Sequence, residues 1–197
     1  IAAGYANLYG QDITERKQAE ILQDALYRIA QAADLRESLD ALYPAIHAIV
    51  QEVMVADNFF IALYDENRDV LSFPYSVDEV DLLVAPEKPG KSLTAYVIRT
   101  AKSLLCDEAV FEDLKQRGEV DLVGEYSEIW LGVPMLVEGK AIGVMVVQDY
   151  KNAHTYGERE QRILEFVSSQ AAIAIHRKRA EEEILQLNAE LEKRVEE

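Results

Sequence analysis

Cysteine and histidine, the side chains best suited to covalent and metal chemistry at neutral pH, are few in this sequence and widely separated. Cysteine occurs once, at Cys106, and histidine three times, at His47, His154 and His176. A single thiol excludes an internal disulfide and a metal site built from cysteines alone. None of the histidines has an acidic residue at a spacing known from catalytic sites. Because catalysis needs a nucleophile, a base or a metal in mutual reach, we expect a chain that catalyses nothing.

Gly90-Lys91-Ser92 is the other segment with chemical potential, because these residue types end a phosphate-binding P-loop. A P-loop needs a further glycine five residues before Gly90, and that position is Ala85. It also needs a buried strand before the loop, whereas the preceding residues here are polar and include two prolines. We therefore interpret the segment as the start of a helix over 93–102, capped by Ser92.

The composition limits the possible partners. The chain has 197 residues and a formal net charge of −16 at pH 7. This charge argues against binding to nucleic acid, because nothing would replace the counterions of the phosphate backbone. No apolar run approaches the roughly 20 residues that span a bilayer, and no secretory signal is present. We therefore expect a cytoplasmic location, one compact domain with additional helix, and no membrane segment in this stretch.

The remaining elements must position any binding site, and a hairpin over 130–147 is central to them. Its two apolar runs, 130–137 and 141–147, are joined by a turn that contains Gly139. The second run is apolar without alternation, which is typical of a strand covered on both faces. We therefore predict that this strand lies in the middle of the sheet.

The other elements follow from apolar periodicity and turn residues. A helix over 39–53 contains Pro44, and His47 lies off its apolar stripe, so we expect His47 at the surface. Pro74 places its strand at a sheet edge. Thr155 with Glu158 predicts a capping box at the start of the last helix. No βαβ repeat appears, so the pattern predicts an α+β domain with a largely antiparallel sheet. Besides the central hairpin, we predict strands over 59–64, 70–77 and 103–106 and a short helix over 107–117.

The two ends of the chain carry apolar residues at a spacing typical of helix–helix seams. The last helix starts packed on the domain and continues in heptad register. We predict that the entry and exit helices pair across a parallel homodimer, and the candidate interface residues are Leu22, Leu26, Ile29, Ile184, Leu187 and Leu191.

Five segments in this order resemble a GAF domain over residues 36–175. They are NFFIALYDENRDVLSFPYSVDE at 58–79, PGKSLTAYVIRTAKSLL at 89–105, WLGVP at 130–134, IGVMVVQDY at 142–150 and AAIAIHRKRAEE at 171–182. The resemblance implies a GAF-like fold with a central antiparallel sheet of about six strands between helical layers. The first and last helices would pack together on one face and dimerise. The other face would carry a small-molecule pocket under the middle helices.

Large aromatic side chains often line small-ligand cavities. The pocket candidates on segments bordering that face are Tyr75, Tyr96, Tyr126 and Trp130. The ligand is unknown. The Asn-Lys…Phe…Asp-Glu signature of cyclic-nucleotide-binding members cannot be traced, and Cys106 lacks the neighbouring histidine of bilin-binding members. Haem would need an axial ligand, and a metal would need a ligand set. The sequence therefore has no bilin, haem or metal signature.

The flanks resemble parts of sensor proteins. GQDITERKQAE at 10–20 resembles the junction between a PAS domain and its linker helix, which implies a PAS remnant at 1–13 and a signalling helix at 14–35. QLNAELEKRVEE at 186–197 resembles the helix before a histidine kinase core, so 176–197 would be a coiled coil leading to an output domain.

The resemblance thus implies a non-catalytic sensory module of a two-component system, which binds a small molecule and signals through a parallel helical dimer. Two alternatives stay open. One is an enzyme on the same fold, such as a free methionine-R-sulfoxide reductase, although those use more than one cysteine because a second thiol resolves the sulfenic acid. The other is a purely structural dimerisation relay upstream of a diguanylate cyclase.

Overall fold

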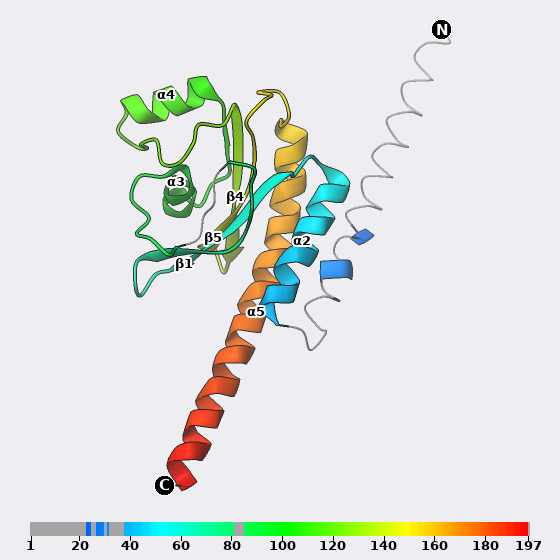
Figure 1. Ribbon diagram of the computed structural model, residues 1–197, viewed down its shortest axis with the longest axis vertical. Coiled ribbons are helices and arrows are strands. Elements are labelled where there is room, and N and C mark those ends of the chain that lie inside the picture. Colours follow the sequence, from blue (N-terminus) through cyan, green and yellow to red (C-terminus); the bar gives the residue numbers. More distant parts are fainter. Residues whose placement is uncertain (1–22, 25–26, 30, 32–37, 81–84, 197) are drawn as a thin grey trace, which may run out of the picture.

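The computed structural model describes residues 23–24, 27–29, 31, 38–80 and 85–196. Its centre is an antiparallel sheet in the order β2-β1-β5-β4-β3. Figure 1 shows α2 and α5 on one side of this sheet and α3 and α4 on the other. The strands are β1 (Asn58–Asp65), β2 (Val70–Val77), β3 (Leu104–Cys106), β4 (Ile129–Val137) and β5 (Lys140–Asp149). The helices are α2 (Leu39–Val53), α3 (Leu93–Thr100), α4 (Glu108–Gln116) and α5 (Glu158–Glu196).

The predicted central strand is confirmed, because β5 is the third of the five strands. Met145 and Val147 face the core beneath α2 and α5, whereas Val144 and Val146 face the second core beneath α3 and α4. All four side chains are fully buried. The hairpin turn is also confirmed: Glu138 and Gly139 both have positive φ, at 50° and 81°, as a two-residue type I′ turn requires.

Pro74 lies in edge strand β2, as predicted, and it accompanies a β-bulge. Ile61 pairs with Tyr75 and Leu63 pairs with Ser72, so Phe73 and Pro74 together oppose a single residue of β1. An inserted residue reverses the face on which the following side chains lie. Phe73 therefore packs toward α3 and α4, and Tyr75 packs toward α2.

The expected count of about six strands is wrong for the described residues, which form five. The segment between β2 and α3 contributes only one isolated bridge, between Leu71 and Glu87. Pro86 and Pro89 flank Glu87 closely, and neither can donate a backbone hydrogen bond to extend a ladder.

The cap predicted at Ser92 is confirmed, because its hydroxyl accepts from the Ala95 amide at the start of α3. Asp107, which the sequence analysis did not single out, caps α4 in the same way. The capping box at Thr155 and Glu158 is wrong. The Thr155 hydroxyl instead donates to the Asp149 carboxylate, because α5 begins two residues later than that box requires. The amide of Gly157 donates to the Glu160 carboxylate over 3.0 Å, which is half of a capping box two residues further along the chain.

The expectation that His47 is exposed is wrong. It is 4% exposed and stacks on Phe59, with ring centroids 4.5 Å apart. Its Nε2 lies 2.7 Å from the Ala56 carbonyl oxygen, which can only accept, so Nε2 carries a proton. In the neutral ring Nδ1 then accepts from the Tyr75 hydroxyl, 2.9 Å away. These hydrogen bonds satisfy a polar side chain within an apolar core. His154 and His176 are exposed.

Helix α5 packs on β4 and α2 through its first half and then extends beyond the domain (Figure 1). Ile184, Leu187 and Leu191 on its outer half are 58%, 53% and 57% exposed. Ile29 is only 2% exposed and joins the core of its own chain. The other two seam candidates, Leu22 and Leu26, lie outside the described residues, as does the 1–13 segment. None of the described helices combines the length and apolar character that crossing a membrane requires.

Gly132 in β4 is required by the side chain of Trp130, two residues earlier on the same face of the sheet. A Cβ at Gly132 would lie 2.1 Å from Cη2 of the indole and 2.5 Å from Cζ3. The indole therefore lies directly over the glycine, which explains why a residue without a side chain occurs in the middle of a buried strand.

We expect Gly132→Ala to displace the Trp130 ring and to lower the free energy of unfolding by about 1–3 kcal/mol, the usual cost of overpacking. Urea denaturation followed by circular dichroism measures the loss. Trp130 is the only tryptophan, so its emission reports the displacement. Gly157→Ala is the matched control, because a Cβ there would meet only a side-chain oxygen at 3.7 Å. The explanation fails if both variants leave tryptophan emission unchanged.

We expect Tyr75→Phe to lower the free energy of unfolding by about 1–3 kcal/mol, because the buried Nδ1 of His47 loses its donor. Tyr64→Phe is the control. It removes a hydrogen bond of 3.0 Å to Asp69 in an exposed setting and should cost less than about 0.5 kcal/mol. Equal losses in urea denaturation would contradict the hydrogen-bonded role of His47.

Candidate functional site

A cavity of about 80 Å³ lies on the face of the sheet that α3 and α4 cover. It is bounded by strand residues beneath, by the first turn of α3, by the start of α4 and by the segment between α4 and β4. Its walls are Phe60, Phe73, Ser92, Leu93, Thr94, Cys106, Phe111, Leu122, Val123, Tyr126, Ser127, Trp130 and Gln148, with Glu87, Asp107, Asp121 and Glu125 also in the lining.

Strand register builds the floor of the cavity. Cys106 pairs with Trp130, and Trp130 pairs with Gln148, so one row of side chains crosses β3, β4 and β5. Phe60 of β1 lies one row further along the same face, with Phe73 packed edge-on at 6.0 Å between ring centroids. The floor is therefore mainly aromatic and ends in a buried amide.

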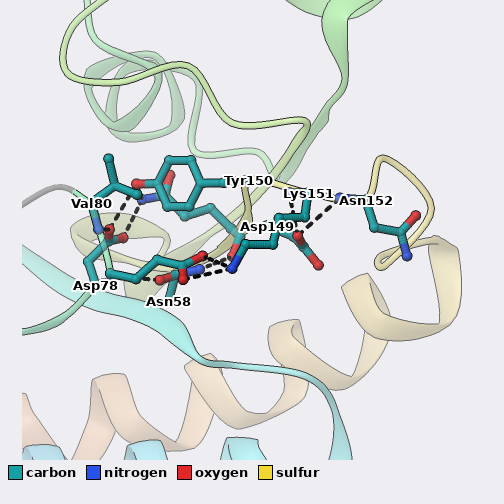
Figure 2. A network of polar contacts seen from close by, with 9 residues as sticks. Asn58, Asp78, Val80, Asp149, Tyr150, Lys151 and Asn152 are labelled. Carbon is teal, nitrogen blue, oxygen red and sulfur yellow. Dashed lines mark hydrogen bonds and ion pairs between the residues drawn. The ribbon is translucent and has the colours of Figure 1, made fainter.

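The Gln148 side chain is 6% exposed and held in one orientation by Asp78 and Tyr150. Tyr150 itself donates to Asp78 over 2.9 Å (Figure 2). The Gln148 Nε2 donates to the Asp78 carboxylate over 2.6 Å and to the Tyr150 hydroxyl over 2.8 Å. A carboxylate can only accept, which fixes the amide nitrogen on that side. Because both amide hydrogens are used, the carbonyl oxygen is the group that Gln148 can offer to the cavity.

Asn58 ties the same end of the site to the segment after β2. Its Nδ2 donates to the Gln148 backbone carbonyl over 3.3 Å, and its Oδ1 accepts from the Glu79 amide over 2.9 Å. Lys151 adds an exposed ion pair to Glu79 at 2.8 Å (Figure 2). These contacts hold β1, β5 and the start of the connection to α3 together beside the cavity.

Thr94 supplies a second buried polar group. It is 6% exposed and lies in the first turn of α3. Within the described part of the chain no residue bonds to its hydroxyl, which is open to the cavity and so differs from the fully enclosed unpaired oxygens of Ser76 and Tyr156. A hydroxyl that opens into a cavity and has no protein partner can bond to a ligand or to water.

Carboxylates are the only charged groups in the described lining. Glu87, Asp107, Asp121 and Glu125 are all exposed, so they surround the opening and do not form the floor. Asp107 has a structural task as well, because its Oδ1 accepts from the Val110 amide at the start of α4.

Cys106 is 3% exposed, and its thiol donates weakly to the Asp107 carbonyl at 3.7 Å. Burial raises the pKa of the thiol to about 12, and the charge of Asp107 adds to the shift. Thiolate is the reactive form, so this cysteine is held in its unreactive state at neutral pH. The described residues contain no cluster of three or more histidine, cysteine or acidic side chains able to hold a metal ion.

The structure places two of the four predicted pocket aromatics, Tyr126 and Trp130, in the cavity wall. Tyr75 lies on the opposite face because of the bulge at Pro74. Tyr96 packs against the core on the cavity side of the sheet, but it is not part of the cavity wall. It lies two residues after Thr94, which turns its side chain to another side of α3. The Arg99 guanidinium lies 5.4 Å from its ring centroid.

Sequence reasoning missed most of the cavity wall. Phe60 and Gln148 could have been found from strand alternation, because they share a face with Val144 and Val146. The unpaired state of Thr94 has no signal in the sequence.

Comparison with solved structures shows the same fold in several proteins. The GAF domain of an Acinetobacter phosphoenolpyruvate-protein phosphotransferase is 21% identical with a TM-score of 0.64, covering 81% of this chain and 95% of that one. The GAF domain of the Coxiella burnetii phosphoenolpyruvate-protein phosphotransferase is 18% identical with a TM-score of 0.65, covering 83% and 97%. Free methionine-R-sulfoxide reductase from Neisseria meningitidis, solved with its substrate, is 15% identical with a TM-score of 0.64, covering 82% and 90%.

At these identities the likeness concerns the fold alone. No curated protein matches the chain. The family is established by the sequence itself, because residues 36–176 match the GAF domain family. With an antiparallel sheet between two helical layers and a cavity under the middle helices, the chain belongs to the GAF domain family.

Proposed function

We propose that this protein is a non-catalytic sensory module that binds a small molecule in the cavity under α3 and α4. The observation that supports the proposal is the Thr94 hydroxyl, which has no partner among the described residues and opens into the cavity beside an aromatic floor. Small-ligand sites combine apolar walls with a few placed polar groups, and this cavity has that composition.

The signal would pass through the sheet to α5. Strand β4 carries Trp130 on its cavity side, and its Pro134 carbonyl accepts from the buried Ser168 hydroxyl of α5 over 3.0 Å. One strand therefore contacts both the cavity and the exit helix. A ligand that favours one position of β4 would bias α5, and a parallel α5 dimer would carry that bias to a cytoplasmic output domain of the histidine kinase type.

The state of Cys106 supports a module over the reductase alternative. A sulfoxide reductase needs a reactive thiolate and a second thiol, whereas this chain has one cysteine, buried and with a raised pKa. A structural relay upstream of a diguanylate cyclase would need no ligand, so ligand binding separates it from a sensor.

We expect a thermal-shift screen of nucleotides, amino acids and small amines to yield a ligand. Binding at 100 times Kd should stabilise the fold by roughly 2.7 kcal/mol. Free methionine sulfoxide with a thiol reductant is the catalytic control and should show no turnover. Turnover would establish the reductase, and a screen in which no compound shifts the midpoint would favour the structural relay.

We expect Leu187→Asp to dissociate the proposed homodimer, because a charge would replace an apolar side chain in the helical seam. Light scattering measures the mass. Val55→Asp is the control, since Val55 is similarly exposed at 52% but lies between α2 and β1, outside the proposed seam. The seam is refuted if Leu187→Asp leaves the mass of a dimeric protein unchanged.

A further inference from the structure

The chemical character of the cavity narrows its ligand, on the condition that the cavity binds one, as proposed above. We infer that it takes a small organic cation, an alkylammonium ion of a few non-hydrogen atoms. Charge, aromatic walls, hydrogen-bond acceptors and volume each support this class.

The charges of the lining have one sign. Glu87, Asp107, Asp121 and Glu125 carry carboxylates, and the described lining has no lysine, arginine or histidine. An anion entering the cavity would meet like charges in this lining, whereas a cation gains from each carboxylate as it passes. The Lys115 ammonium lies 5.8 Å from the centroid of the Phe111 ring, but Lys115 is not part of the lining. Anionic ligands such as carboxylates and phosphates are thereby disfavoured.

The buried walls suit a positive charge despite being apolar. Phe60, Phe111 and Trp130 are at most 6% exposed. The faces of aromatic rings carry negative potential and attract ammonium groups, most strongly when the pair is shielded from water. An uncharged apolar wall would have excluded any ion, so the aromatic content decides this point.

The buried polar groups of the cavity offer acceptors. The amide hydrogens of Gln148 are already donated to Asp78 and Tyr150, which leaves the carbonyl oxygen. Thr94 contributes a hydroxyl oxygen without a partner among the described residues. Ammonium N–H groups are donors only, and they complement such acceptors.

The volume sets the size. A cavity of about 80 Å³ exceeds what one water molecule needs but falls below the several hundred Å³ of sites for drug-sized molecules. Ethylammonium and tetramethylammonium are ions of suitable size.

Trp130 gives a direct readout, because it is the only tryptophan and forms part of the cavity floor. The full chain is titrated with ethylammonium chloride and with tetramethylammonium chloride, at an ionic strength held constant with sodium chloride. Tert-butanol serves as the neutral counterpart of similar size and sodium acetate as the anion. We expect a saturable change in Trp130 emission with at least one of the cations and none with tert-butanol or acetate.

Asp121→Asn tests the charge. Asp121 is exposed, and its side chain makes no contact that the fold requires. Among the described residues, its one hydrogen bond is made by the backbone amide, which donates to the Lys91 carbonyl. Removing one exposed charge should weaken cation binding about two- to fivefold. Asp40→Asn, the same change on α2 across the sheet, should leave the affinity unaltered. Thr94→Val removes the hydroxyl acceptor without changing the charge, and it should also weaken the binding of ethylammonium.

Equal effects of Asp121→Asn and Asp40→Asn would overturn the role of the rim charges. Saturable binding of tert-butanol or acetate without binding of either cation would overturn the cation inference while leaving a ligand-binding module. If neither these probes nor any compound of the wider screen perturbs Trp130, both the inference and the proposed sensory function fail.

Discussion

The fold depends on one constraint, that β5 is apolar on both of its faces. Met145 and Val147 must be covered from one side and Val144 and Val146 from the other, and all four are fully buried. A strand of this kind cannot lie at an edge or face water. It requires two helical layers, and the two layers do different work. The layer of α2 and α5 fills its side with a continuous core, whereas the shorter helices α3 and α4 leave a cavity.

The position of the cavity follows from the end of the apolar run in β5. Gln148 continues the face of Val144 and Val146 but is polar, so its burial must be compensated by hydrogen bonds. Asp78 and Tyr150 supply them. Because their contacts occupy the amide hydrogens, the carbonyl oxygen stays available where the apolar packing ends. The same row contains Trp130, whose indole lies over Gly132. Core and cavity are therefore two parts of one face, separated by a change from aliphatic to polar and aromatic residues.

Sequence reasoning predicted the elements well because each carried a local signal: apolar runs for the strands, Ser92 as a cap, and Pro74 for an edge. The incorrect predictions concern how side chains pack once the elements come together. A bulge at Pro74 places Tyr75 on the opposite face; a proline in a strand is compatible with a plain edge position or with a bulge, and the sequence does not distinguish the two. His47 was assigned to the surface from its helical position, although Tyr75 and Ala56 bury it with two hydrogen bonds. The cavity wall depends on which side chains stay unpaired after folding, as Thr94 does, and only coordinates reveal that.

Coupling between the cavity and α5 is limited by how tightly α5 packs on the sheet. Ser168 is fully buried and bonded to Pro134, and Leu164, Ala171 and Ile175 are buried on the same side of the helix. Close-packed side chains do not deform gradually, so a ligand can move α5 only between discrete packed arrangements. A ligand shifts that equilibrium by no more than its difference in affinity for the two arrangements. Trp130 is the side chain best placed to sense this difference, because β4 also contacts α5, and Gly132 beneath the indole leaves no side chain in its path.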